Sequence, residues 1–157
     1  MDWDAIGAIG EIVGTAAVFG SLFYVGKQIS HSVLAIKGQT FQSLAQSLVQ
    51  LNSTLLENTG SAEIVGKTTK GEELSESEFM SYQILMIPVF RNAESAHYQY
   101  QLGLIEREQL MSLTGQFYTT LTTRESRRVW DLMKAQRPRE FREFIEGIIQ
   151  ELDEHKD

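Results

Sequence analysis

The chain contains no cysteine among its 157 residues, so it can form neither a disulfide nor a thiolate metal site, and it has no cysteine nucleophile. It has only two prolines, Pro88 and Pro138, and long stretches are therefore free to be helical. Basic residues are in deficit, because 14 Lys and Arg accompany 21 Asp and Glu for a net charge of −7. This balance argues against a general nucleic-acid-binding protein.

Charged side chains are also nearly absent from residues 5–26, where Glu11 is the single exception. A helix over this stretch would be roughly 33 Å long at about 1.5 Å per residue, which is enough to cross a bilayer. The chain begins Met-Asp-Trp-Asp, which is negative where a secretory signal is positive, so we interpret the stretch as a retained anchor. Lys27 and Lys37 follow it and no basic residue precedes it, so we expect the N-terminus outside and the C-terminal part in the cytoplasm.

Helical periodicity continues through the rest of the chain, and no alternating strand pattern is evident. We expect helices over about 4–57, 75–103, 106–121, 125–135 and 139–153. The run Ser75-Glu76-Ser77-Glu78 offers a capping box, Pro88 should kink the helix that follows, and residues 59–73 are predicted to be a mobile loop. The predicted fold is all-α: a transmembrane segment at 1–29 that continues into a cytoplasmic helical domain at 30–157.

The span carries a narrow face of small or polar residues. Steps of four and three residues connect Gly7, Glu11, Gly14, Val18, Ser21, Val25 and Gln28. Two small-residue spacings, which let membrane helices approach closely, add candidate packing positions at Gly10, Gly14, Ala16 and Gly20. If copies associate through this face, the residues that line a pore are Glu11, Gly7, Gly14, Thr15, Val18 and Ser21.

The carboxylate within the span leads to two functional hypotheses and a structural one. A ring of Glu11 side chains in a cyclic homo-oligomer of four or more copies would attract cations, and a divalent ion such as Ca²⁺ would best relieve the repulsion within the ring. The alternative function is a membrane-tethered interaction module or accessory subunit, with residues 59–73 and the basic stretch at 124–142 as its contact points. The structural reading is a carboxyl group that is protonated, or bonded to Thr15 or to the backbone, and only holds helices together.

Three segments resemble a widespread family of uncharacterised small bacterial membrane proteins. They are Ile9-Gly10-Glu11-Ile12-Val13-Gly14 with Ser21-Leu22-Phe23-Tyr24-Val25, then Arg91-Asn92-Ala93-Glu94 with Tyr98-Gln99-Tyr100-Gln101-Leu102-Gly103-Leu104-Ile105, and Val129-Trp130 with Pro138-Arg139-Glu140-Phe141. The resemblance implies a bacterial source, and thus the inner membrane, with one N-terminal span and a helical domain. It implies no activity.

No enzyme motif is evident, and we do not expect this protein to be an enzyme. Gly66-Lys67-Thr68 resembles the end of a phosphate-binding loop, but its glycine spacing is wrong and no strand precedes it. Glu94-x-x-His97 has the spacing of a di-iron ligand pair, but it lacks a second such pair, so we interpret His97 as a packing or surface residue.

Seven basic residues crowd into residues 124–142, namely Arg124, Arg127, Arg128, Lys134, Arg137, Arg139 and Arg142. Acidic residues lie between and after them, so we favour a solvated face with helix ion pairs. A patch that contacts anionic lipid or an acidic neighbour is the other interpretation.

Overall fold

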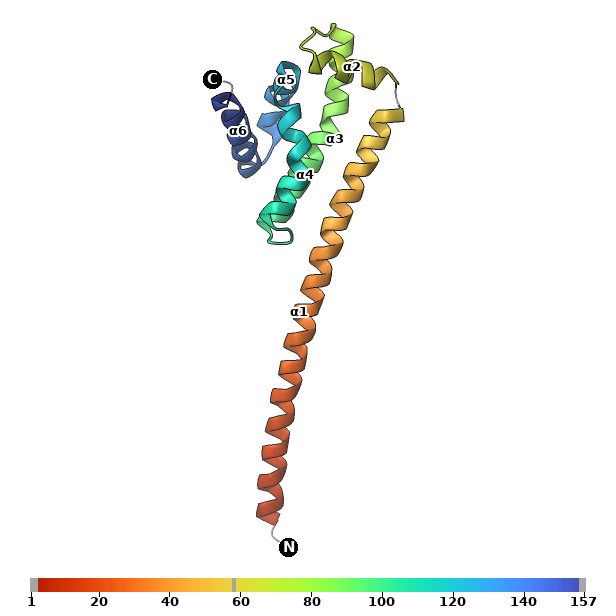
Figure 1. Ribbon diagram of the computed structural model, residues 1–157. Helices are drawn as coiled ribbons and strands as arrows, with labels where there is room; N and C mark the ends of the chain where they lie inside the picture. The colour runs from red at the N-terminus through yellow and green to blue at the C-terminus, as the bar shows by residue number, and fades with distance from the viewer. Residues whose placement is uncertain (1–2, 58, 156–157) are drawn as a thin grey trace. The chain divides into compact units, whose positions relative to one another are not determined.

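The structure is a computed structural model that describes residues 3–57 and 59–155, with the side chains of 4–9, 12, 54–57 and 59 outside the description. Over these residues all regular structure is helical, which confirms the all-α prediction (Figure 1). The elements are α1 (Trp3–Glu57), α2 (Thr59–Thr69), α3 (Glu76–Gln101), α4 (Arg107–Thr120), α5 (Arg124–Met133), the 3₁₀ turn η1 (Lys134–Gln136) and α6 (Arg139–Glu154).

The chain divides into two units, Met1–Gln39 and Thr40–Asp157. The first unit consists of one helical segment of α1 and therefore has no core of its own. Its large apolar side chains are exposed, among them Val13, Val18, Phe19, Leu22, Phe23, Ile29 and Leu34.

Within the described residues, no helix combines the length and the apolarity needed to cross a membrane. The side chains of residues 5–9 and 12, which belong to the predicted span, lie outside the description. The transmembrane segment stays a prediction.

The second unit is built around aromatic side chains from four helices. Phe90 of α3 is fully buried between Phe117 of α4, at 4.8 Å between ring centroids, and Trp130 of α5, at 5.4 Å. Phe141 of α6 closes the cluster by meeting Trp130 edge-on at 5.9 Å. Figure 1 shows α3 and α4 side by side, and their contact is the most extensive between helices of this unit.

A second cluster brings the C-terminal part of α1 into the same unit. Leu44 of α1 is buried with Ala96 of α3 and Leu110 of α4, and Phe41 and Leu48 pack against them. Because these α1 residues recur every three or four positions, they lie on one side of the helix and leave the other side exposed.

Local signals in the sequence explain where α3 begins and ends. The hydroxyl of Ser75 accepts from the backbone N–H of Glu78, and the Glu78 carboxylate accepts from the backbone N–H of Ser75, so the predicted capping box is present. Gly103 follows the helix with φ of +69°, a conformation that favours glycine. Pro88 lies within α3 and does not end it.

The predicted loop at 59–73 is wrong over most of its length. Residues Thr59–Thr69 form α2, and only a short connection separates it from α3. Tertiary contacts account for this helix, because Ile64 packs against the aromatic core and Lys67 pairs with Glu78 of α3 at 2.5 Å. Local composition alone, with Gly60 and Gly66, does not favour a helix.

Candidate functional sites

The first candidate site is the face of α1 around Glu11. Glu11, Thr15, Val18 and Ser21 are all exposed in the N-terminal unit. The Thr15 hydroxyl donates to the backbone carbonyl of Glu11 at 2.8 Å, and the Ser21 hydroxyl donates to that of Val18 at 2.8 Å. Both hydroxyls are therefore used by the helix itself, and the Thr15 hydrogen bond goes to the Glu11 backbone rather than to its carboxylate.

The predicted packing positions of α1 are open. A Cβ atom added at Gly10, Gly14 or Gly20 would meet nothing within 4 Å, and Ala16 is exposed. Among the described residues, no contact therefore requires a glycine at these positions. The environment of Gly7 lies outside the described residues.

Clustered metal ligands are predicted only through association of several copies at Glu11. Over the part of the chain that the structure describes, no group of three or more His, Asp or Glu side chains is arranged to hold an ion. The predicted Ca²⁺ site at Glu11 stays a prediction.

The Glu94-x-x-His97 pair lies inside the helical domain and is held by structural contacts. Arg137 donates to the Glu94 carboxylate at 2.7 Å, and Arg91 lies 3.7 Å from the same oxygen. The His97 ring is buried and stacks on Phe144 at 4.7 Å between centroids. Burial lowers the pKa of His97, which favours its neutral form. These contacts confirm the interpretation of His97 as a packing residue.

The Gly66-Lys67-Thr68 segment is part of α2 and forms no phosphate-binding loop. Lys67 is engaged by Glu78, and the Thr68 hydroxyl donates to the carbonyl of Val65 at 2.8 Å. The hydrogen bond from Lys67, followed by those from Ser75, lowers the pKa of Glu78 to about 2. The segment therefore ties α2 to the start of α3.

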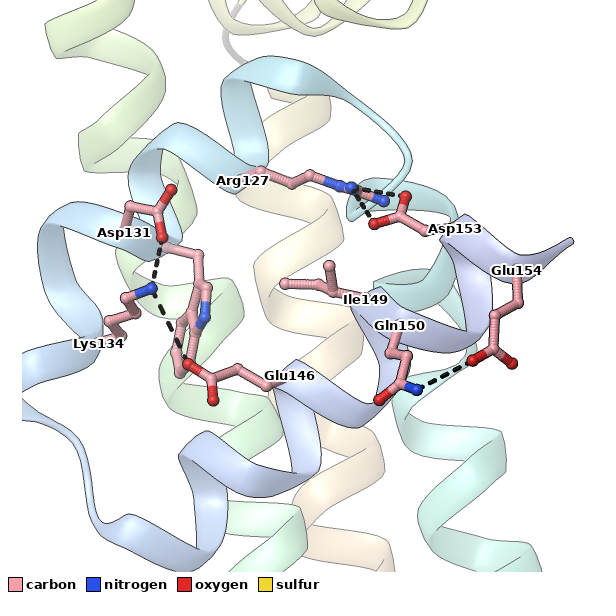
Figure 2. Close-up of a pocket in the computed structure, with 9 residues that line it drawn as sticks. Arg127, Asp131, Lys134, Glu146, Ile149, Gln150, Asp153 and Glu154 are labelled. Atoms are coloured by element: carbon pink, nitrogen blue, oxygen red, sulfur yellow. Dashed lines mark hydrogen bonds and ion pairs between the residues drawn. The ribbon is translucent and has the colours of Figure 1, made fainter. Parts of the chain in front are cut away.

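An open groove between α5 and α6 contains two residues of the basic stretch, Arg127 and Lys134 (Figure 2). Arg127 reaches across it to both carboxylate oxygens of Asp153, at 2.8 and 2.9 Å. Lys134 lies 2.7 Å from Asp131 and 3.9 Å from Glu146. Since its charges are paired with each other, this groove offers no cluster of unpaired positive charge.

Three of the remaining basic residues of the stretch have similar contacts. Arg137 pairs with Glu94, and the guanidinium of Arg128 lies 3.8 Å from the centre of the Phe79 ring. Arg139 lies 3.6 Å from Glu143. These contacts favour the ion-pair interpretation of residues 124–142 over a patch for anionic lipid. Sequence spacing could identify the i,i+3 and i,i+4 pairs but not those that join separate helices.

A cavity of about 370 Å³ lies within the helical domain between α1, α2, α3 and α4. Its apolar wall includes Leu48, Val65, Met86 and Leu113. No charged side chain is among the described residues that line it. Sequence analysis missed this cavity, because its lining comes from four helices whose packing no single pattern specifies.

Comparison with protein-family models, curated proteins and solved structures finds no match for this chain. The resemblance noted from the sequence therefore stays a prediction.

Proposed function

We propose that this chain is a single-span protein of the bacterial inner membrane whose copies associate through α1 into a closed homo-oligomer. Glu11 lines a cation path in that oligomer. The helical domain lies on the cytoplasmic side and the short N-terminus on the periplasmic side.

The observation that carries the proposal is the apolar exposure of the N-terminal unit. A single helix there exposes Val13, Phe19, Leu22, Phe23 and Leu34 to its surroundings. Such side chains favour an apolar environment by about 25 cal/mol for each Å² removed from water. Extended apolar exposure is characteristic of surfaces that contact lipid or protein.

Glu11 gives the proposed assembly its chemistry. A charge within an otherwise apolar membrane helix costs a few kcal/mol, so it should face protein or water rather than lipid. Ser21 and Gly14 recur at three- and four-residue steps from it and make the same face small or polar. Rings of carboxylates select cations in channels, and Ca²⁺ binds several carboxylate oxygens at once.

The first experiment is the mass of the purified full-length protein in nanodiscs, with the bound lipid subtracted. A closed ring of four or more copies supports the proposal, and a monomer or dimer refutes a pore made by this chain alone.

Ion flux through reconstituted protein then tests the role of Glu11. The variant Glu11→Gln should lose selectivity for divalent over monovalent cations. Glu76→Gln, the same change at an exposed position in the helical domain, should leave selectivity unchanged. Unaltered selectivity in Glu11→Gln would exclude the carboxylate ring.

The cavity in the helical domain favours a second candidate, a membrane-tethered interaction module. Its uncharged lining and its volume of about 370 Å³ suit an apolar side chain of a partner protein. On this reading the purified protein would be monomeric or dimeric until the partner is added, so the same mass measurement separates the two candidates.

A further inference from the structure

We infer that the exposed face of α1 within the helical domain is a contact between copies of this chain, arranged in parallel and in register. This outer face consists of Gln42, Gln46, Val49 and Ser53. The inference rests on the self-association proposed above and extends it from the predicted span into the helical domain.

The outer face is exposed and lies beside the side of α1 that the domain's own core uses. Leu44 is buried, and Phe41 and Leu48 are half-buried, against the second core cluster. At 3.6 residues per turn, the outer face is centred about 120° around the helix from the core side, and Val49 is 65% exposed. Gln42, Gln46, Val49 and Ser53 are therefore exposed, although they adjoin the core side of the helix.

The absence of charge on this face is unusual for a helix surrounded by water. Residues 38–56 contain no Asp, Glu, Lys or Arg. Soluble domains average about 25% charged residues, and solvated helix faces hold most of them. The outer face instead carries neutral amides, a hydroxyl and an exposed valine.

The charge of the whole chain indicates what covers this face. Each copy has a net charge of −7, so copies repel each other wherever acidic surfaces meet. A neutral face that is the same on every copy avoids this repulsion. A shallow depression at the same place could receive side chains of a second helix, and it is lined by Phe41, Gln42, Ala45, Gln46, Val49 and Gln50.

Residue spacing in the sequence links the outer face to the narrow face of small or polar residues that is predicted in the span. The same steps of four and three residues, continued past Gln28, reach Ser32, Ala35, Gln39, Gln42, Gln46, Val49 and Ser53. A repeat that averages 3.5 residues is the signature of helices that pack along their length, and polar residues at such positions fix register. The orientation is parallel, because every copy enters the membrane in the same direction.

Hydrogen bonding within α1 makes the contact feasible. The Ser53 hydroxyl donates to the carbonyl of Val49 at 3.0 Å, so packing a neighbour there leaves no unpaired donor. The amides of Gln42 and Gln46 carry both donors and acceptors and can pair with the same residues of a second copy.

The absence of native cysteine allows a direct test by single-cysteine cross-linking. Full-length Gln46→Cys protein in native membranes is treated with a short bis-maleimide. Ser47→Cys is the matched control, because Ser47 is exposed on the same turn but points about 100° away around the helix. We expect covalent dimers to dominate for Gln46→Cys and to stay at background for Ser47→Cys. Equal or reversed yields would overturn the inference.

Charge insertion provides a second measurement that separates this inference from the proposed function. Gln46→Glu should dissociate the oligomer in nanodiscs, because like charges would then meet in register, whereas Ser47→Glu should not. If the wild type is an oligomer of four or more copies and Gln46→Glu leaves its mass unchanged, the outer-face contact is wrong while the proposed function stands. A monomeric wild type overturns both.

Discussion

The ion pair between Arg137 and Glu94 allows a quantitative test of the helical domain. The Arg137 side chain is 7% exposed and the Glu94 side chain 19% exposed, and the pair joins α3 to the connection before α6. Removing one partner of a fully buried pair costs about 3–5 kcal/mol. Because Glu94 keeps some contact with water and Arg91 lies 3.7 Å away, we expect Arg137→Met to lower the free energy of unfolding by about 2 kcal/mol.

Tryptophan fluorescence during denaturant unfolding of the full-length protein provides the assay. The chain has two tryptophans, and Trp130 is 1% exposed whereas Trp3 is 74% exposed, so the spectral shift on unfolding reports on the helical domain. Arg139→Met is the matched control. Its ion pair with Glu143 is solvent-exposed, so it should cost at most about 0.5 kcal/mol.

A double variant decides whether the cost comes from an unpaired buried carboxylate. Glu94→Met combined with Arg137→Met removes both charges, and we expect it to be less destabilised than the sum of the single variants. Strict additivity, or a loss in Arg137→Met no larger than in Arg139→Met, would refute the reasoning.

Three further predictions concern packing and pH. Phe90→Ala should lower the unfolding free energy by about 3–5 kcal/mol in the same fluorescence assay, because the ring is fully buried against Trp130. The pKa of Glu78 is lowered in the folded state, so its pairing with Lys67 stabilises the fold above pH 4.5, and this stabilisation is lost as the pH falls toward about 2. Unfolding curves of Glu78→Gln should therefore lack this part of the acid dependence. The pKa of His97 is also lowered, so protonation favours the unfolded chain, and stability should decline below pH 6.5 in the wild type but less in His97→Phe.

Much of the helical architecture could be predicted because local signals and tertiary packing agree. Ser75 and Glu78 set the start of α3 through their own hydrogen bonds, and Gly103 marks its end through a backbone conformation that favours glycine. The predicted extent of the first helix, 4–57, agrees with α1 to within a residue. Each of these features depends on residues that are close in sequence.

The helix α2 could not be predicted because its stabilising contacts are distant in sequence. Glycines and threonines between 59 and 69 favour a loop, and Lys67 finds its partner eleven residues away on α3. The Arg137–Glu94 pair joins residues even further apart, and nothing in either local pattern specifies it. Packing of this kind overrides weak propensity.

The two parts of α1 show what a periodic pattern can and cannot decide. Around Leu44 and Leu48, the apolar side of the helix is explained by the core that buries it, and the pattern needs no further partner. Around Val18 and Leu22, apolar residues are exposed within a unit that has no core, so their burial requires lipid or another molecule. Periodicity alone is the same in both regions. Burial within the domain therefore explains the apolar residues of the first region, whereas no packing among the described residues explains those of the second.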